Sequence, residues 1–425
     1  MLIKELYQLF LQFPSIQTDS RKLKAGDIFF ALKGPNFNAS QFAVQALYAG
    51  AAYAVVDEST GPEDSRIIKV PDVLNCLQEL AKYHRQKFNI PFLAITGSNG
   101  KTTTRELIHA VLSPACKTYT TEGNLNNHIG IPLTILKIKA DADIAIIEMG
   151  ANHLKEIEAY CSYTMPTHGL ITNCGKAHLE GFGGEEGVRK GKGELFEYIK
   201  VNNGTAFIFL DYPYLQPICE GIKEIKTYGT HEGDITGVIK DSAGFLEVAI
   251  TKGADINTIH TKLIGEYNLP NILAAVIVGK YFKVTDEKIK TAIENYIPSN
   301  SRSQLIKKDG NTFILDAYNA NPTSMKAAIE NFAKMRGNEK ILLLGAMMEL
   351  GEDSIAEHQF IISLISNYTW KAVVLVGGDF TKLKQPYINF DNSLQAKEWL
   401  QGQHFTNTQL LIKGSRSMQM EKILE

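Results

Sequence analysis

Short apolar runs alternate with stretches of helical spacing along most of the chain. Within residues 1–89, apolar runs at 28–32 and 52–56 are separated by helical stretches at 40–49 and 73–88. This alternation is typical of a small α/β domain. The motif Asn-Ile-Pro at 89–91 then breaks the last helix and precedes a strongly apolar run.

A second block, from about 90 to 298, has the same alternation with more strongly apolar strands. Its predicted buried strands lie at 92–96, 143–148, 169–172 and 206–210. Near-continuous apolar runs of this kind suit a parallel sheet that is covered on both faces. The stretch 227–263 is rich in Thr, Gly and β-branched residues, which predicts an antiparallel hairpin insert, and a helix is expected at 268–281.

A third block, residues 299–425, again alternates strands with helices. Its predicted strands lie at 313–316, 340–344, 372–376 and 410–412. This pattern is typical of a doubly wound, Rossmann-like sheet. The sequence therefore predicts an α/β protein of three domains, namely a small N-terminal domain (1–89), a central parallel-sheet domain (90–298) and a C-terminal doubly wound domain (299–425).

Composition and charge argue against several classes of partner. Lys plus Arg number 44 and Asp plus Glu number 46, so the net charge of −2 does not favour nucleic acid or an anionic membrane. The five cysteines are scattered and contain no C-x-x-C pair, which fits a reducing compartment. Residues 1–13 have helical spacing with charges inside it and not a signal-peptide core, so we expect a cytoplasmic protein, by default a monomer.

The most specific local motif is the segment 94–104, AITGSNGKTTT. A predicted strand ends in a Gly-rich turn and a helix begins at Lys101, an order in which backbone N–H groups and the helix N-terminus surround phosphate oxygens. Lys101 would reach the β- and γ-phosphates, and the Thr102 hydroxyl would bind Mg²⁺. The first glycine of the common motif is replaced by Ile95, so a plain Gly turn with a surface lysine is the alternative.

Two further groups follow the next predicted strands. Glu148 ends the strand 143–148, where a carboxylate could bind Mg²⁺ near phosphates, or could equally be a solvated acid at a strand end. Asn173 and His178 follow the strand 169–172 on the same predicted edge, although a single histidine is more often structural or exposed. The segment 189–194, RKGKGE, is expected to be a loop before a helix, and its residues alone favour a solvated basic turn over an anion site.

Taken together, these motifs stand in the order found in Mur ligases, and the chain resembles that family over essentially its whole length. Mur ligases are ATP-dependent enzymes that form the amide bonds of the peptidoglycan peptide stem. The resemblance is carried by TGSNGKTT (96–103), EGNLNNHIGIP (122–132), IEMGAN (147–152), ITNCGKAHLEGF (171–182), KGE (192–194), GEYNLPNILAA (265–275), SR (301–302), DAYNANPTSM (316–325), GAMMELG (345–351) and His358.

The resemblance implies an ATP site with two magnesium ions. It assigns the phosphates to Gly97, Ser98, Asn99, Gly100, Lys101, Thr102 and Thr103, and the adenine side to Asn268 and Asn271. Arg302, Asp316 and Tyr318 would complete the ATP site from the C-terminal domain, and Asp316 could otherwise be a plain strand-end acid. Metal ligands would be Thr102, Glu148 and His178, and Lys192 would carry a carbamate, so that Lys101, Lys192 and His178 form the catalytic set.

The resemblance is greatest to members that add D-alanyl-D-alanine to UDP-N-acetylmuramoyl-tripeptide through an acyl phosphate. It rests on the segments at 316–322 and 348–351, and the D-N-P-R motif of diamino-acid-adding members is absent. Asp19-Ser20-Arg21 and the segment 26–34 resemble the UDP-sugar domain, so Ser20, Arg21 and Lys33 are expected to bind substrate, together with Asn319 and Asn321. The third residue of the tripeptide, diaminopimelate or lysine, is left open.

The chain departs from the family pattern at Asn38-Ala39-Ser40, Tyr267 and Ala346, which affects details of UDP-sugar contact, adenine contact and loop docking. Two other functions remain as alternatives. One is a related ligase, either the diamino-acid-adding type or a folylpolyglutamate synthase. The other, disfavoured because Lys101, Glu148 and Lys192 are all present, is a non-catalytic nucleotide-binding protein.

Overall fold

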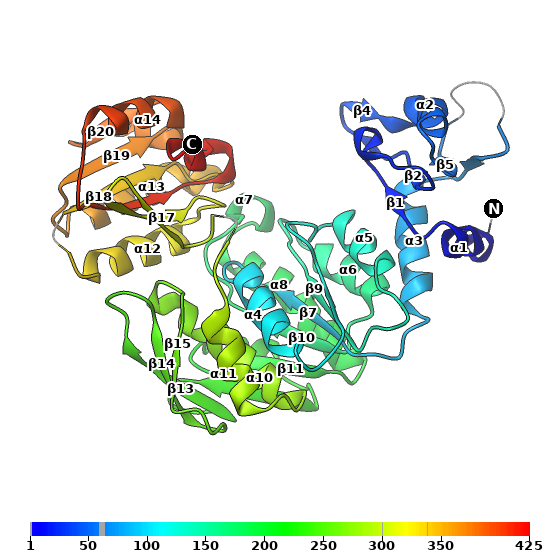
Figure 1. The fold of residues 1–425 in the computed structure, drawn as a ribbon, viewed down its shortest axis with the longest axis horizontal. Coiled ribbons are helices and arrows are strands. Elements are labelled where there is room, and N and C mark those ends of the chain that lie inside the picture. The colour runs from blue at the N-terminus through cyan, green and yellow to red at the C-terminus, as the bar shows by residue number, and fades with distance from the viewer. Residues whose placement is uncertain (1, 59–63, 300, 338) are drawn as a thin grey trace.

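A computed structural model describes residues 2–58, 64–299, 301–337 and 339–425, and these form three main β-sheets in three parts of the molecule (Figure 1). We call these the N-terminal part (α1 to α3), the central part (β7 to α11) and the C-terminal part (β16 to η7). The predicted α/β fold class is confirmed. In the described residues, no helix has both the length and the apolar character needed to cross a bilayer.

The N-terminal part contains a parallel sheet of order β1-β2-β5-β6. Helix α1 forms as predicted and buries the stripe Leu6, Tyr7 and Phe10. Helix α3 packs against α1 and also against α5 and α6 of the central part, so it connects the two parts. The elements are α1 Ile3–Gln12, β1 Ile16–Gln17, η1 Ser20–Lys22, β2 Ile28–Phe30, β3 Lys33–Gly34, β4 Phe37–Asn38, η2 Ala39–Phe42, α2 Ala43–Tyr48, β5 Tyr53–Val56, β6 Ile67–Lys69 and α3 Val73–Arg85.

The central part is built on a sheet of order β15-β14-β13-β12-β11-β10-β7-β9-β8. The strands β7, β9, β10 and β11, which were predicted from their apolar runs, pair in parallel, and β8 and β12 extend this parallel region on either side. The elements are β7 Phe92–Thr96, α4 Lys101–Leu112, β8 Thr118–Thr120, α5 Gly130–Leu136, β9 Ile144–Glu148, α6 Glu156–Thr164, β10 His168–Ile171, α7 Leu179–Phe182, α8 Glu185–Val201, β11 Thr205–Phe209, α9 Leu215–Ile218, β12 Glu224–Gly229, β13 Ile235–Asp241, β14 Glu247–Lys252, β15 Thr258–His260, η3 Glu266–Asn268, α10 Leu269–Tyr281 and α11 Asp286–Asn295.

The predicted hairpin insert at 227–263 is antiparallel from β13 to β15. It is not a separate sheet, however, because β13 also pairs in parallel with β12 through Tyr228 and Ile235. The hairpin therefore extends the central sheet at one edge. It also reaches the C-terminal part, where Asp241 accepts a 3.4 Å ion-pair contact from Arg336.

The C-terminal part has a sheet of order β16-β17-β21-β18-β19-β20 in which β16 is the antiparallel edge strand. The four strands predicted from the sequence are β17, β18, β19 and β21. The elements are β16 Gln304–Lys308, β17 Asn311–Asp316, α12 Pro322–Lys334, β18 Lys340–Gly345, η4 Gly351–Asp353, α13 Ser354–Ile365, β19 Ala372–Val376, η5 Gly378–Lys382, β20 Ile388–Phe390, α14 Ser393–Gly402, β21 Gln409–Lys413, η6 Arg416–Met418 and η7 Met420–Ile423.

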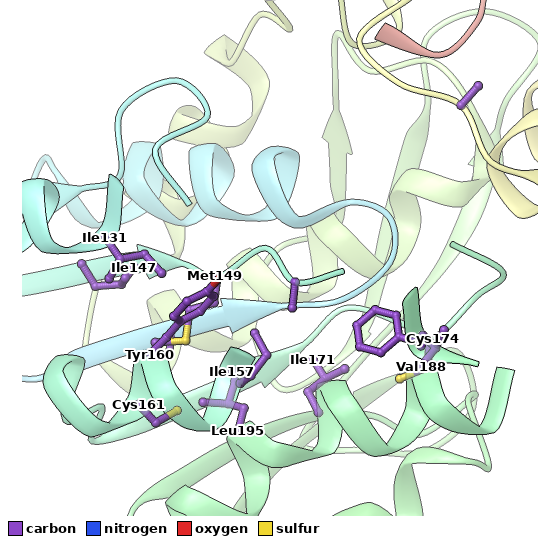
Figure 2. Packing of buried hydrophobic residues seen from close by; sticks show 14 of the residues in the cluster. Ile131, Ile147, Met149, Ile157, Tyr160, Cys161, Ile171, Cys174, Val188 and Leu195 are labelled. Carbon is purple, nitrogen blue, oxygen red and sulfur yellow. The ribbon is translucent and has the colours of Figure 1, made fainter. Parts of the chain in front are cut away.

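The central sheet is buried on both faces because successive strand residues point to opposite sides. Leu93 and Ile95 of β7 face a core with α4 and α10, whereas Phe92 and Ala94 face the core on the other side. Figure 2 shows this second core, in which Ile157 of α6 and Leu195 of α8 are packed. With both faces covered, the carboxyl edge of the sheet is left for ligands.

Helix α8 corrects one prediction. The segment 189–194 lies inside this helix and not in a loop before it. Gly191, one of the two glycines that suggested a loop, is instead required by packing, because a Cβ there would overlap the Phe182 ring. One turn earlier in the helix, a Cβ at Gly187 would overlap the carbonyl oxygen of Phe182. These glycines let α7 lie directly against α8.

We predict that Gly187→Ala destabilises the protein by about 1–3 kcal/mol, since the added methyl meets backbone that cannot rotate away. In an isolated helix the same change would be favourable by roughly 1 kcal/mol, so the sign of the effect is decisive. Urea denaturation measures the change. Gly244→Ala is the control, because its Cβ would meet nothing within 4 Å. Equal or greater stability of Gly187→Ala would contradict the close packing of α7 on α8.

Candidate active site

The turn between β7 and α4 has the backbone geometry of a phosphate loop. Gly97 and Gly100 have φ values of 142° and 81°, which side chains other than glycine rarely adopt. A Cβ at Gly97 would overlap the Thr172 hydroxyl, and one at Gly100 would lie 2.7 Å from Oδ1 of Asn271. Both glycines are therefore needed for conformation and for space.

The residues after β10 hold this turn in place. The N–H of Ser98 donates to the Asn173 carbonyl at 2.8 Å, and the N–H of Asn99 donates to Oδ1 of Asn173 at 3.1 Å. The Thr172 hydroxyl in turn donates to the Asn99 carbonyl at 2.6 Å. The predicted position of Asn173 on the same edge as the turn is confirmed, and its contacts make the turn rigid before any ligand binds.

Lys101 begins α4, and its ammonium group folds back onto the turn. Its Nζ donates to the carbonyl oxygens of Gly97 and Ser98, the latter at 3.2 Å. Burial lowers the pKa of Lys101 to about 8, partly opposed by the negative charge of Glu148. A phosphate group would be a better partner for this cation than two neutral carbonyls.

Glu148 ends β9 and is only 1% exposed. Its Oε1 accepts hydrogen bonds from the Thr102 hydroxyl at 3.1 Å and from Nδ2 of Asn126 at 2.8 Å. Its Oε2 accepts no hydrogen bond from a described residue, although it forms an ion pair with the buried Arg105 guanidinium, whose Nε lies 3.6 Å away. A buried carboxylate oxygen that accepts no hydrogen bond keeps its lone pairs available for a metal ion.

The chemistry of these groups fits Mg²⁺. In the part of the chain that the structure describes, no three acidic, His or Cys side chains form a metal-binding cluster. A magnesium ion here would therefore take few ligands from the protein, namely Thr102 and Glu148, and the rest from phosphate and water. Mg²⁺ commonly binds in this way beside nucleotide phosphates.

Lys192 lies on α8 with 1% of its surface exposed. Its Nζ donates to the Ala151 carbonyl at 2.9 Å and lies 4.9 Å from the centre of the Phe182 ring. Burial, and then the positive charge of Lys101, lower the pKa of Lys192 to about 7. A large fraction of this amine is therefore neutral and nucleophilic near neutral pH.

His178 directly precedes α7, a short helix on the side of the central part that faces the C-terminal part (Figure 1). Its Nδ1 forms an ion pair with Glu349, which lies between β18 and η4. This contact holds the pKa of Glu349 below its usual value. His178 and Glu148 line the same cavity, and the histidine side chain itself contacts the C-terminal part through Glu349.

Asn268 and Asn271 lie behind the phosphate loop, and both are buried. Asn271 accepts a hydrogen bond from the Thr104 hydroxyl at 3.0 Å and donates to Asn268 at 2.9 Å. Asn268 donates to the Ile264 carbonyl at 2.8 Å. This chain of bonds fixes the start of α10 against α4.

Residues of the C-terminal part form the opposite wall. Cζ of Arg302 lies 3.7 Å from the centre of the Tyr318 ring. Asp316, at the end of β17, pairs with Nζ of Lys413 at 2.6 Å and accepts from the Ser303 N–H at 3.1 Å. Asp316 thus fixes the segment that carries Arg302 to the C-terminal sheet.

Most of the predicted ligand residues share one cavity of about 810 Å³. Those that line it are Ser98, Asn99, Gly100, Lys101, Thr102, Thr103, Glu148, His178, Asn268, Asn271, Arg302, Asp316, Tyr318, Asn319 and Asn321. Gly97 and Lys192 lie outside its lining. Ser20, Arg21 and Lys33 lie in the N-terminal part, where Arg21 pairs with Asp19 and Lys33 pairs with Asp57.

Known protein families match all three parts of the chain. The model described as "Mur ligase family, catalytic domain" matches residues 12–85, "Mur ligase middle domain" matches 95–279, and "Mur ligase, glutamate ligase domain" matches 301–416. A UDP-N-acetylmuramoyl-tripeptide–D-alanyl-D-alanine ligase from Bacillus subtilis is 34% identical, over 96% of this chain and 92% of that protein. The chain belongs to the Mur ligase family.

Solved structures agree with this assignment. The crystal structure of MurF from Acinetobacter baumannii is 31% identical, with a TM-score of 0.86 over 96% of this Mur ligase and 92% of that chain. A MurF ligase from Thermotoga maritima in complex with ADP is 26% identical, with a TM-score of 0.88 over 97% of both chains.

Several site residues of this Mur ligase were not singled out from the sequence. Asn126 stands within the motif 122–132, but its contact with Glu148 depends on how the loop after β8 folds back. Lys413 ends an apolar strand, and no local pattern distinguishes it from a surface lysine. Arg105 lies one helical turn after Lys101, a spacing that could have placed it on the side of α4 near Glu148.

We predict that Lys192→Met stabilises this Mur ligase without ligands and in CO₂-free buffer. In the native state Lys192 is either neutral or a buried cation, and both cost free energy of folding below its ordinary pKa. In the unfolded chain the amine has that ordinary pKa of 10.5 and is protonated at lower pH. The penalty is complete below about pH 7 and disappears as the pH approaches 10.5. The advantage of the variant should therefore shrink by about 1.4 kcal/mol per pH unit above about pH 7.5.

Chemical denaturation at several pH values between 6.5 and 9.5 measures this advantage. Lys190→Met is the matched control, because Lys190 is exposed on the same helix. An advantage of Lys192→Met that does not change with pH would contradict the burial of a titrating amine.

Proposed function

We propose that this Mur ligase joins D-alanyl-D-alanine to UDP-N-acetylmuramoyl-tripeptide and converts ATP to ADP and phosphate. The observation that carries the proposal is the cavity in which the phosphate loop, Glu148 and the C-terminal wall with Arg302 meet. Full-length similarity to ligases of this specificity supports the choice of substrates.

The reaction solves a leaving-group problem. A free carboxylate would have to expel an oxide or hydroxide, so the tripeptide carboxylate first attacks the γ-phosphorus of ATP, and the bond to the β–γ bridging oxygen breaks to release ADP. The amine of D-alanyl-D-alanine then attacks the acyl phosphate carbon. The tetrahedral intermediate collapses as the carbon–oxygen bond to phosphate breaks, and the amine nitrogen loses its proton.

The residues assigned to ATP surround this chemistry with positive charge and N–H donors. We place the phosphates on the turn from Gly97 to Thr103 and the adenine beside Asn268 and Asn271. Lys101 would exchange its carbonyl partners for phosphate oxygens, which offsets the repulsion between carboxylate and triphosphate. Arg302, Asp316 and Tyr318 would close the site and exclude the water that hydrolyses an acyl phosphate.

Magnesium would be held by Thr102 and Glu148, with His178 contributing to a second ion. The Oε2 of Glu148, which is buried and accepts no hydrogen bond from a described residue, supports this assignment. When bound, the metal neutralises charge on the phosphate oxygens and so favours attack by an anion. Thr102 and Asn126 keep the carboxylate of Glu148 oriented toward the phosphate loop.

Lys192 is proposed to carry a carbamate. Carbon dioxide reacts with the neutral amine, forming a nitrogen–carbon bond and releasing one proton. The burial of Lys192 and its lowered pKa, to about 7, support this reaction because they provide the neutral amine. The product replaces a buried cation with an anion that could contribute oxygen ligands to magnesium.

We propose that the N-terminal part binds the UDP-sugar and that the C-terminal part binds the amine substrate. Ser20, Arg21 and Lys33 would contact the UDP-sugar, and Asn319 and Asn321 the incoming amine substrate. Asn321 also caps α12 and donates to Oδ1 of Asn99 at 2.8 Å, so it links the C-terminal part to the phosphate loop. The domain boundaries proposed at 89/90 and 298/299 fall between α3 and β7 and between α11 and β16.

A cytoplasmic site of action is proposed because ATP and UDP-linked precursors are available there. The cysteines of the described structure are free, which is compatible with a reducing compartment. A monomeric state remains a prediction.

We expect phosphate and ADP release to require both UDP-N-acetylmuramoyl-tripeptide and D-alanyl-D-alanine. A coupled ADP assay, with the product mass as a second readout, measures this dependence. Diaminopimelate, lysine and glutamate are tested in place of the dipeptide, and Lys101→Ala is expected to lower kcat/KM by about 10²-fold or more, since it removes a charge aimed at the transferring phosphoryl group. Turnover with another amine, together with no turnover with D-alanyl-D-alanine, would contradict the proposed specificity.

We expect Lys192→Ala to lose at least about 10²-fold in kcat, because a buried group next to the metal site is removed. Short-chain carboxylates such as formate or acetate should restore part of this activity by replacing the carbamate oxygens. The matched control is Lys190→Ala, which removes an exposed lysine of the same helix. Activity of Lys192→Ala equal to that of the unchanged protein would end the carbamate proposal.

A further inference from the structure

The contact between His178 and Glu349 joins two parts of the molecule at the edge of the cavity. His178 belongs to the central part and Glu349 to the loop after β18 in the C-terminal part. Besides the ion pair of their side chains, the N–H of Glu180 donates to the Glu349 carbonyl at 3.4 Å. Gly351 packs against Glu180 in the same contact, where an added Cβ would lie 3.3 Å from the Glu180 Cβ.

The backbone at both ends of this contact adopts an uncommon conformation. His178 has a φ of 54° and Glu349 has a φ of 62°, both in the left-handed region. Each such residue costs of order 1 kcal/mol and persists only where its surroundings determine it. Because two residues with this backbone conformation contact each other through their side chains, we infer that the contact does more than fill space between the two parts.

The chemistry of the pair matches a recurring arrangement around metals. A histidine that binds a metal through one ring nitrogen usually has its other nitrogen held by a carboxylate, which fixes the ring and its tautomer. Glu349 contacts Nδ1 of His178, and Nε2 makes no hydrogen bond with a described residue. His178 lines the cavity, whereas Glu349 does not.

We propose that Glu349 is a positioning residue that holds the His178 imidazole with Nε2 available to the second metal ion. The inference rests on the proposed metal role of His178. Its consequence is that the histidine is correctly oriented only when the C-terminal part is docked, so that metal binding and domain docking are coupled. The carboxylate of one part thereby completes a metal site whose ligands lie on another.

A separate set of contacts also holds the C-terminal part against the central part, and this makes the proposal testable. Lys176 pairs with Glu357 of α13 at 2.6 Å, and its N–H donates to the Thr323 hydroxyl at 3.0 Å. Lys176→Met removes an ion pair across the same interface without touching His178. It therefore separates loss of docking from loss of ring positioning.

The experiment is pulsed electron paramagnetic resonance of Mn²⁺ bound to the full-length protein with ADP. Manganese replaces magnesium, and modulation by nitrogen reports a directly bound imidazole. We expect this signal in the unchanged protein and its loss in His178→Gln. In Glu349→Leu we expect the signal to be lost or strongly reduced and the Kd for Mn²⁺ to rise by about 10- to 100-fold, with a smaller rise in Glu349→Gln.

Lys176→Met and Glu352→Leu should keep the nitrogen signal; Glu352 is an exposed acid three residues from Glu349. An unchanged signal and Kd in Glu349→Leu would overturn the positioning role, and tighter Mn²⁺ binding would overturn it by making Glu349 a competitor of the metal. If Lys176→Met lost the nitrogen signal as fully as Glu349→Leu, the positioning role would be overturned, and Glu349 would be only a docking contact. Absence of the signal in the unchanged protein would instead overturn the metal role of His178.

Discussion

Charged groups are buried at the carboxyl edge of the central sheet before any ligand has bound. Lys101 and Lys192 donate to neutral carbonyl oxygens, and one oxygen of Glu148 has no hydrogen-bond partner among the described residues. Burying incompletely paired ions costs free energy, which the tightly packed cores on both faces of the sheet must offset. A metal–triphosphate complex would supply the missing partners of both signs.

This constraint explains why the site is assembled from separate parts. The phosphate loop and Glu148 belong to the central part, whereas Arg302 and Asp316 belong to the segment and sheet that follow it. Contacts such as Asn99 with Asn321 and Lys176 with Glu357 bring these walls together. A site divided in this way can admit two large substrates and still exclude water when it closes.

Local patterns predicted much of the molecule. The strand β7, the turn after it and the start of α4 at Lys101 were predictable because apolar run, glycines and helix follow one another directly in the chain. Glu148 was predictable because it ends a buried strand. By contrast, the helical position of Lys192 was missed, because Gly191 and Gly193 suggested a loop, and only the structure shows the Phe182 ring packed against Gly191. The roles of Lys413 and Asn126 depend on contacts between distant segments, which no local spacing encodes, whereas the helical spacing of Arg105 after Lys101 could have indicated its position.

The central claim is that Glu148 and Thr102 hold a metal ion against ATP phosphates. Anomalous diffraction from crystals grown with Mn²⁺ and a non-hydrolysable ATP analogue tests it most directly. We predict a manganese peak within coordination distance of Oε2 of Glu148 and the Thr102 hydroxyl, with the phosphates along the turn from Gly97 to Thr103. A nucleotide bound elsewhere, or a manganese peak that neither residue touches, would contradict the account.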